Sequence, residues 1–599
     1  MKSIRYAGDA LREFWAQWAN YLVIVWLVLG VTDLALVPLL RWTVGEMLVA
    51  AGVPYIGFDN ILGVITGHVV LTVGLILLGL VMLVLVYAQF SFLLGGVQGI
   101  RQRQAPTLKA IAREAWSDLQ HLRIGSFVFF VFYFLLVIPF AGTVVGSSLL
   151  AKVQIPTFIM EWIGTKPLLA FLVFAFYLVM AYLGLRWILV LPNTVLKNQP
   201  LRKAAGESWR QTSGHFWFYF WRTFWLTLIL QGITFVFTQL LIWAQTGLDK
   251  TPVAYIGAII TMTILLLGKM VLGGMSSAVF LIFLTAPVYV KEGQIANAAK
   301  HSLIHYHGWM RRVTLVVGTV ILLSIILFNG IYLYGGLDHH PLTISHRGVD
   351  NGNGVQNTIP ALRKTARERP DYVEMDVHET RDHQFIVLHD ENLKDLAGID
   401  KRPSQMTLAQ LKRVTVRENG HHAKLASLGA YMTAAERAHQ RLIVEIKPTQ
   451  YDSKDMLSLF IKRYGQRLIH NHDRVHSLSY SVINRLHHRL PKLYVSFILP
   501  YSITLPNTHF NAYTLEESTL NSDMVGAAQA RGQAVWAWTV NDQDEMEQMM
   551  FAQADGIITD RLGLLKKTIS ENNDHPSYAQ RLRLFSDTFD KDDTGTVEN

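Results

Sequence analysis

The sequence VEMDVHET, residues 373–380, predicts a short β-strand, because apolar and β-branched side chains alternate there with charged ones. Successive side chains of a strand point to opposite faces, so Glu374 and Asp376 are expected to project together. Two neighbouring carboxylates repel each other unless a cation or a shared proton lies between them. The stretch therefore predicts a strand that carries a charged site.

Short apolar strands and amphipathic helices alternate on both sides of this stretch, from residue 341 onward. The expected strands cover 342–346, 372–377, 385–389, 442–447, 474–479, 493–499, 534–540 and 555–559. Helix-length pieces such as TIPALRKTARERP and DQDEMEQMMFAQ separate several of them. About eight β/α units in roughly 230 residues indicate a (β/α)8 TIM barrel, whose chemistry gathers at the C-terminal ends of the strands.

Polar residues stand at the predicted strand ends. In chain order these are His346 and Arg347, Glu374 and Asp376, His389 and Asp390, Glu445 and Lys447, Trp538, and Thr559 and Asp560. The three glutamate and aspartate carboxylates of the second and fourth strands suit a hard cation such as Ca²⁺ or Mg²⁺. Arg347 and Lys447 suit a phosphate, and the two histidines suit a general base and acid. Together they indicate phosphodiester cleavage.

Each feature also has a structural interpretation. A single histidine at a strand end is more often structural or solvated than catalytic, and Glu445 can pair locally with Lys447. The Glu-x-Asp pair can form salt bridges with nearby arginines. The order of all these residues at successive strand ends favours a site. Histidines without that context are expected to be structural, namely His305, His307, His339, His340, His421, His422, His487 and His488.

The span from about 343 to 565 resembles the glycerophosphodiester phosphodiesterase family. The matching pieces are HRG, QNTIPAL, VEMDVHETRDHQFIVLHDENL, VEIK, AWTVN and ADGIITD. The resemblance implies a barrel enzyme that uses one divalent cation, Ca²⁺ or Mg²⁺, to release sn-glycerol 3-phosphate and an alcohol. It also implies a small insertion, here at about 393–428.

The resemblance implies roles for the strand-end residues of this chain. They are His346 and His389 as the acid–base pair, Glu374, Asp376 and Glu445 as metal ligands, Arg347 and Lys447 as phosphate contacts, and Trp538 in the substrate pocket. Two motifs depart from the family pattern. The usual Glu-Asn-Thr reads Gln356-Asn357-Thr358, and the segment after the insertion reads LASLGA (425–430) without its usual acids.

The N-terminal half is predicted to lie in a membrane. Residues 1–339 hold 23 Lys/Arg against 12 Asp/Glu, whereas residues 340–599 hold 31 against 33, so the basic excess belongs to the apolar half and nucleic-acid binding is disfavoured. Cysteine is absent, which excludes disulfides and thiolate metal sites. The N-terminus lacks a signal-peptide pattern.

About seven membrane spans are expected. Uncharged runs of 28, 26 and 25 residues follow Arg123, Arg222 and Arg312. Further candidates lie near 20–40, 65–97, 167–195 and 254–289. Arg186 and Lys269 fall within predicted spans and Asp33 near the end of another. Such charges line a cavity or meet a lipid head group, or else they snorkel or form buried ion pairs. The first half is also similar to the membrane domain of some bacterial family members.

An internal repeat sets the expected orientation. LKAIAREAW, LRKAAGESW and ANAAKHSL end at Trp116, Trp209 and Leu303, and each is a polar-faced helix before a span. The N-terminus and these segments carry 17 Lys/Arg, against four in the opposite loops, which places them in the cytoplasm and everything after Leu337 outside. The linker 335–342 spans at most about 29 Å, which tethers the barrel to the outer surface.

The sequence thus predicts three parts, a multi-pass membrane domain at 1–337, the barrel at 338–570, and a polar, disordered tail at 571–599. Expected substrates are soluble glycerophosphodiesters, membrane-anchored polyglycerolphosphate or a lysophospholipid. Two alternatives stay open. One is a lipid-binding or transport membrane protein with a regulatory barrel, and the other is a phospholipase D-like lyase similar to sphingomyelinase D. Outward-half aromatics, among them Tyr501, Phe510 and Tyr513, shape the leaving-group pocket or fill the barrel core.

Overall fold

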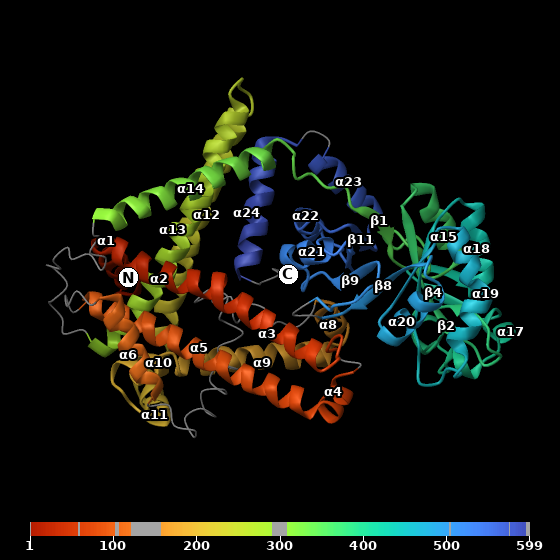
Figure 1. Cartoon of the computed structure of the whole chain (residues 1–599), viewed down its shortest axis with the longest axis horizontal. Coiled ribbons are helices and arrows are strands. Elements are labelled where there is room, and N and C mark those ends of the chain that lie inside the picture. Colours follow the sequence, from red (N-terminus) through yellow and green to blue (C-terminus); the bar gives the residue numbers. More distant parts are fainter. Residues whose placement is uncertain are drawn as a thin grey trace.

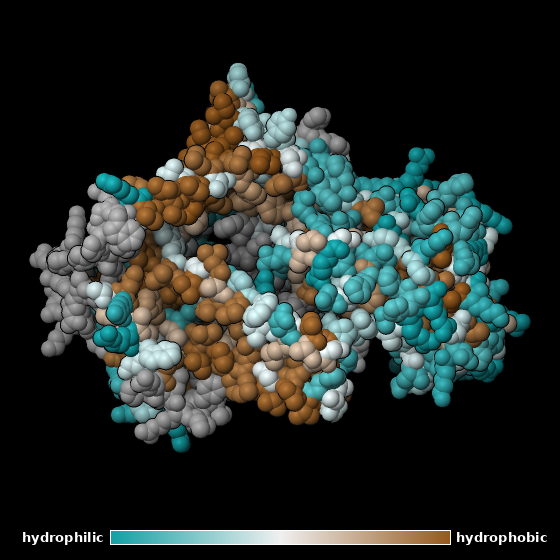
Figure 2. Space-filling view, viewed as in Figure 1, coloured by the Kyte–Doolittle hydropathy of each residue, from teal (hydrophilic) through white to brown (hydrophobic). Residues whose placement is uncertain are grey.

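A helical N-terminal part and a C-terminal α/β barrel lie side by side in this protein (Figure 1). The structure is a computed structural model that describes residues 2–57, 60–101, 107–120, 157–289, 308–501, 505–573 and 576–594. Apolar side chains gather on the surface of the helical part, whereas the barrel surface is mostly hydrophilic (Figure 2). This division agrees with a membrane-embedded half and a solvated half.

Six helical segments in the described part of the chain are long and apolar enough to cross a membrane. They are Trp18–Ala50 (α2 Trp18–Val31, η1 Thr32–Leu36 and α3 Val37–Ala50), Val69–Arg101 (α5), Pro167–Leu196 (α9 Pro167–Arg186 and α10 Val190–Leu196), Phe216–Leu248 (α12), Ala254–Pro287 within α13 (Ala254–Tyr289) and Arg312–Leu333 within α14 (Gly308–Leu333). They match six of the seven predicted spans. The seventh, at 124–151, falls outside the described residues.

Shorter helices flank the spans. They are α1 (Lys2–Ala16), α4 (Ile61–Gly67), α6 (Leu108–Gln120), α8 (Thr157–Gly164) and α11 (Leu201–Thr212). Two repeat segments lie on α6 and α11, and the third, 296–303, lies outside the described residues. Arg186 is buried beside α11, where its guanidinium donates to the Trp209 carbonyl (2.9 Å) and lies 4.2 Å from the centre of the Trp209 ring. Its charge is therefore turned inward, away from lipid.

Eight parallel strands close into a barrel. They are β1 (Leu342–Ser345), β2 (Tyr372–Glu379), β6 (Leu442–Ile446), β7 (Arg474–Ser477), β8 (Tyr494–Leu499), β9 (Ala512–Glu516), β10 (Ala534–Trp538) and β11 (Gly556–Thr559). Each strand pairs with the next, and β1 pairs with both β2 and β11, which closes the ring. The predicted TIM barrel is confirmed.

One strand of the prediction was wrong. Residues 385–389 were expected to form the third barrel strand, but β3 (Phe385–Val387) pairs antiparallel with the end of β2, outside the ring. The third barrel strand is β6, so Glu445 lies on the third strand and Lys447 directly follows it, where the prediction had the fourth. The prediction missed β9, which is the sixth strand of the ring in chain order. An apolar run such as FIV is compatible both with a parallel barrel strand and with an antiparallel strand outside the ring. Periodicity does not distinguish these two cases.

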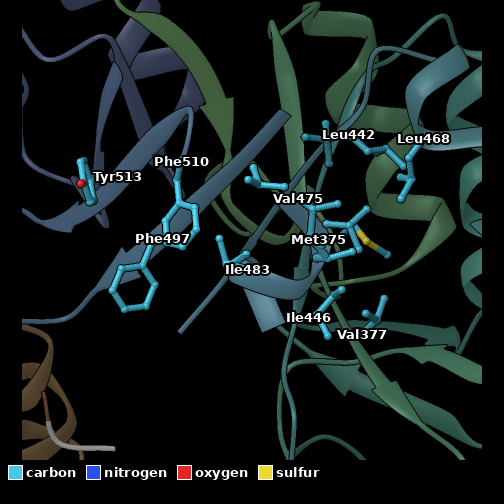
Figure 3. Packing of buried hydrophobic residues seen from close by; sticks show 14 of the residues in the cluster. Met375, Val377, Leu442, Ile446, Leu468, Val475, Ile483, Phe497, Phe510 and Tyr513 are labelled. Atoms are coloured by element: carbon cyan, nitrogen blue, oxygen red, sulfur yellow. The ribbon is translucent and has the colours of Figure 1, made fainter. Parts of the chain in front are cut away.

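Along each strand, side chains point alternately into the barrel interior and outward toward the covering helices. Val373, Met375 and Val377 of β2 pack outward in a buried cluster with the covering helices, part of which Figure 3 shows. That cluster also contains Phe510 and Tyr513, two of the aromatics assigned by the sequence to a pocket or to the core. The covering helices are α15 (Ile359–Thr365), α18 (Leu428–Arg437), α19 (Met456–His470), α20 (Tyr480–Arg489), α21 (Ser522–Gln529), α22 (Gln543–Phe551) and α23 (Leu562–Asn573).

A small subdomain stands where the insertion was expected. It comprises α16 (Lys394–Ala397), η5 (Pro403–Gln405), α17 (Leu408–Leu411) and the hairpin of β4 (Thr415–Glu418) and β5 (His421–Lys424). Leu393, Leu411 and Val416 form part of its own apolar core together with Ile386 of β3. The insertion is thus packed against the mouth-side end of β2, through β3.

Residues 578–594, part of the tail predicted to be disordered, form a helix, α24 (Tyr578–Thr594). It packs against α12, α13 and α22. Lys269, buried in α13, donates to the Ser586 carbonyl (2.9 Å) and hydroxyl (2.7 Å), and Arg581 pairs with Asp338 (2.6 Å). Leu582 and Phe585 face the spans. The polar, acidic composition of the tail hid this apolar stripe.

We expect Phe585→Ala to loosen α24, because its ring packs 5.8 Å from the rings of both Tyr332 and Phe551. Removing a buried phenylalanine ring costs about 3–5 kcal/mol. Hydrogen exchange of the full-length protein should show faster exchange of the α24 amides. Arg583→Ala, on the exposed face of the same helix, is the matched control. Equal protection of α24 in both variants would contradict the assigned packing.

Candidate active site

Strand register brings four polar side chains together inside the barrel. Asp376 of β2 lies in register with Glu445 of β6, which lies in register with His476 of β7. Glu374 precedes Asp376 by two residues and shares its face. All four residues are buried. The carboxyl ends of the three strands therefore hold a row of ionisable groups in a low-dielectric interior.

Glu374, Glu445 and His476 form a compact group of metal-ligating atoms. One ligand atom from each residue lies within 4.8 Å of the others, and His476 Nε2 is 3.5 Å from Glu374 Oε1. Glu374 Oε1 and both ring nitrogens of His476 are buried without a hydrogen-bond partner among the described residues. Buried polar atoms are nearly always paired, so this donor set fits a divalent cation.

The sequence prediction did not select His476. The strand 474–479 was expected, and alternation alone puts Arg474 and His476 on one face of it. Only the pairing of β7 with β6 shows that this face lines the site. The order of neighbouring strands is a tertiary property, and the mistaken strand at 385–389 obscured it.

Asp376 is neutralised by protein groups. Lys447 Nζ lies 3.1 Å from Asp376 Oδ1, and the Asn357 side-chain amide donates to Asp376 Oδ2 (2.7 Å). Burial opposes ionisation, but Lys447, His389 and Arg347 hold the pKa of Asp376 well below its ordinary value. Lys447 also lies 3.2 Å from Glu445 Oε1. The lysine thus bridges two of the three predicted metal ligands.

His346 is held by a carboxylate at the end of the last strand. Its Nδ1 lies 2.9 Å from Asp560 Oδ1, and Asn541 donates to the other oxygen of Asp560 (3.1 Å). Burial lowers the pKa of His346, but the nearby Asp560 carboxylate outweighs burial and raises it above the ordinary value. The reciprocal interaction lowers the pKa of Asp560 to about 2. This geometry favours a protonated imidazole.

His389 has the opposite tendency. Its Nδ1 lies 2.7 Å from Asp390 Oδ1, and His378 Nε2 lies 2.9 Å from its backbone carbonyl. Burial lowers the pKa of His389, and the hydrogen bond with Asp390 only partly offsets this. Two histidines at one barrel mouth therefore favour different protonation states, the pattern required for an acid and a base.

Arg347 reaches the site through both its backbone and its side chain. Its left-handed backbone (φ 51°) directs its N–H to Glu374 Oε2 (2.8 Å). Its guanidinium lies 3.8 Å from Asp376 Oδ2 and donates to the Gln356 side chain (2.7 Å). The predicted phosphate contacts, Arg347 and Lys447, therefore both lie beside the buried carboxylates.

Gln356 marks the departure from the family motif, and Glu418 of the insertion lies against it. The Gln356 backbone N–H and side-chain amide donate to the two Glu418 carboxylate oxygens, at 2.8 and 2.5 Å. Glu418 belongs to β4, so the subdomain supplies a negative charge next to the position where the family glutamate is absent. Long-range packing, not the local motif, provides it.

Trp538 and Glu516 are register partners at the carboxyl ends of the neighbouring strands β10 and β9. Trp538 is half-buried and Glu516 is buried. The sequence prediction missed Glu516 because it missed β9. An open cavity of about 600 Å³ lies at another side of the mouth, lined by His389, Lys447 and acidic residues of the loop that follows β3.

Two family models match the chain. Residues 9–328 match the membrane domain of glycerophosphoryl diester phosphodiesterase, and residues 346–476 and 479–564 match the glycerophosphoryl diester phosphodiesterase family. The first match covers more than half of the chain, and the second covers the barrel after β1 together with the subdomain.

Known proteins are similar over the barrel. A glycerophosphodiester phosphodiesterase of Caldanaerobacter subterraneus is 27% identical over 37% of this chain and 93% of its own length. Human lysophospholipase D GDPD1 is 38% identical over 11% of this chain and 21% of its own. The crystal structure of a Parabacteroides distasonis glycerophosphodiester phosphodiesterase is 26% identical and covers 39% of this chain and 98% of its own, with a TM-score of 0.35. The structure of an Oleispira antarctica phosphodiesterase in complex with the product sn-glycerol-3-phosphate is 18% identical. It covers 40% of this chain and 99% of its own, with a TM-score of 0.35.

We expect His476→Ala to weaken divalent-cation binding at least about tenfold, because it removes one of three convergent ligand groups. Titration of the full-length protein with Mn²⁺, followed by the electron paramagnetic resonance signal of free Mn²⁺, measures the affinity without catalysis. His422→Ala, an exposed histidine of β5, is the control. Unchanged Mn²⁺ affinity in His476→Ala would remove this residue from the ligand set.

Proposed function

Because the chain belongs to the glycerophosphoryl diester phosphodiesterase family as a multi-pass membrane protein, we propose that its barrel hydrolyses glycerophosphodiesters at the outer membrane surface. The products would be a glycerol 3-phosphate and an alcohol. The observation that carries the proposal is geometric: His346 on Asp560 and His389 on Asp390 lie at the barrel mouth that also holds the Glu374, Glu445 and His476 group. The strand before His346 and the strands that carry this group, β1, β2, β6 and β7, are consecutive neighbours in the ring.

His389 is proposed as the general base. Its lowered pKa leaves the imidazole neutral near pH 7, so that it accepts a proton from the attacking water or from the neighbouring glycerol hydroxyl. His346 is proposed as the general acid, because Asp560 stabilises its protonated form. As the new phosphorus–oxygen bond forms and the bond to the alcohol breaks, His346 gives its proton to the leaving alkoxide.

The cation would be held by Glu374, Glu445 and His476, with Asp376 beside them as a further candidate ligand. A bound divalent cation supplies charge neutralisation at the phosphate oxygens. The carboxylates suit Ca²⁺ or Mg²⁺, and the imidazole adds a nitrogen donor that borderline metals accept. Arg347 and Lys447 would orient the phosphate, and Trp538 would line the pocket for the substrate.

The membrane half supports an outward-facing barrel. Seventeen basic residues on the repeat side, against four on the other, favour cytoplasmic repeats. Leu333 ends the last span only a few residues before β1 begins at Leu342, and α24 fastens the end of the chain to the spans. A barrel held this close to the bilayer suits a lipid-linked glycerophosphate. The name of the human relative, lysophospholipase D, agrees with that class.

The test is release of glycerol 3-phosphate from a soluble glycerophosphodiester by purified full-length protein in detergent, with and without chelator. We expect chelator-sensitive release, and losses of about 10²–10⁴-fold in His346→Ala and in His389→Ala. His422→Ala should retain activity. Absence of release with Ca²⁺, Mg²⁺ or Mn²⁺ supplied would favour the lipid-binding or transport alternative. A cyclic phosphate as the final product would favour the lyase.

The pH profile should separate the two histidines. In Asp560→Asn the carboxylate that raises the pKa of His346 is lost, so the acid loses its proton at lower pH and the alkaline limb of kcat/KM moves down. In Asp390→Asn the hydrogen bond that raises the pKa of His389 is lost, so the acidic limb moves down instead. The same limb moving in both variants would contradict the assigned roles.

A further inference from the structure

The membrane part reaches into the barrel through one loop. Tyr55, which follows span α3, is only 7% exposed and belongs to the buried cluster around the barrel strands. Its ring lies 4.9 Å from that of Phe497 on β8 and 5.4 Å from that of Tyr480. Arg41 of α3 pairs with Asp523 of α21 (2.7 Å). The end of α3 and the loop after it therefore contact α20, β8 and α21 of the barrel.

A large cavity lies at this joint. Its volume is about 1130 Å³, and both halves of the chain line it, with Val49, Ile61 and Leu75 on the membrane side and Leu505 and Met524 on the barrel side. Ligand pockets are commonly ~300–1,000 Å³, so a long ligand fits here. Of the charged residues that line it, Arg41 pairs with Asp523, Arg531 donates to the Pro506 and Ala527 carbonyls, and Glu46 is exposed. The remaining lining is mostly apolar.

Residues from two environments line this cavity. On one side it is bounded by Trp42 and Val49, which are 63% and 60% exposed on a membrane-spanning segment and would face lipid. On the other side it is bounded by Tyr480, four residues after His476, and by Tyr501, two residues after the end of β8. Both follow the carboxyl ends of strands, where the candidate active site lies. Figure 2 shows the apolar membrane surface meeting the hydrophilic barrel at this junction.

We propose that this cavity holds the acyl chain of a lysophospholipid whose phosphodiester lies in the barrel mouth. The proposal rests on the proposed function and names its substrate class. Continuity with the lipid-facing surface favours an acyl chain over a soluble ligand. In a polyglycerolphosphate polymer, most of the bonds to be cleaved lie far from the lipid anchor, so such a substrate does not require an acyl cavity beside the mouth.

The reaction would leave the acyl chain on the glycerol. The oxygen of water bonds to phosphorus, the bond between phosphorus and the head-group oxygen breaks, and the head-group alkoxide takes up a proton. The products are an acylated glycerol 3-phosphate, still seated in the cavity, and a free alcohol that leaves through the polar side of the mouth.

Ala527→Trp tests the proposal, because Ala527 lines the cavity from an exposed position on α21 and a tryptophan there fills space without disturbing the core. Ala530→Trp, at the exposed end of the same helix and outside the cavity, is the matched control. We expect KM for palmitoyl-lysophosphatidylcholine to rise at least about tenfold in Ala527→Trp only, with kcat/KM for glycerophosphocholine unchanged. Equal effects on both substrates, or none on the lipid, would overturn the proposal.

A binding measurement separates this inference from the proposed function. Lysophosphatidylcholine with a photoreactive diazirine in its acyl chain should label residues 42–57 and 505–531 of the full-length protein, and Ala527→Trp should suppress that labelling. Labelling elsewhere, or labelling that the variant does not change, would refute the acyl site. Labelling as expected without hydrolysis of either substrate would leave the acyl site intact and refute the proposed function.

Discussion

The crowding of negative charge inside the barrel is the constraint on which the rest of the site depends. Asp376 and Glu445 are buried register partners on β2 and β6, and the buried Glu374 precedes Asp376 by two residues. Three ionised carboxylates are not stable together in a low-dielectric interior without positive charges nearby. Burial raises the pKa of Glu445, whereas positive neighbours keep the pKa of Asp376 low. Lys447 forms ion pairs with two of the three carboxylates, those of Asp376 and Glu445. A cation between Glu374, Glu445 and His476 would neutralise the remaining negative charge. The same positive groups suit a phosphate, so stabilising the site and binding the substrate have one physical origin.

Contacts at two places tie this barrel to the membrane half, around the loop after α3 and along α24. Tyr55 packs among the barrel residues, and α24 returns from the end of the barrel to pack on the spans, where Lys269 binds Ser586. A buried lysine amine in a membrane-spanning helix needs hydrogen-bond acceptors, and the tail helix supplies them. The chain therefore passes from the spans to the barrel and then back to the spans.

The insertion shows how a fold replaces a residue that its motif lacks. Gln356 occupies the position of the family glutamate, yet Glu418 from β4 contacts it through two hydrogen bonds, and Gln356 contacts Arg347. A charge supplied from a hairpin about sixty residues further along the chain preserves the negative character next to that arginine. This arrangement makes the subdomain part of the mouth as well as a cover over β3.

The sequence alone determined the class of fold, the six spans that the structure describes, and the positions at strand ends where polar residues gather, because strand and span periodicity are local properties of the chain. Tertiary structure decided which strands are neighbours. It replaced the strand at 385–389 with β9, placed His476 beside Glu445, and brought Glu418 to Gln356. It also turned the polar tail into α24, because Leu582 and Phe585 fold only against the spans that cover them. Local pattern fixes which way a side chain faces, but only the closed ring and the packed helices decide what it meets.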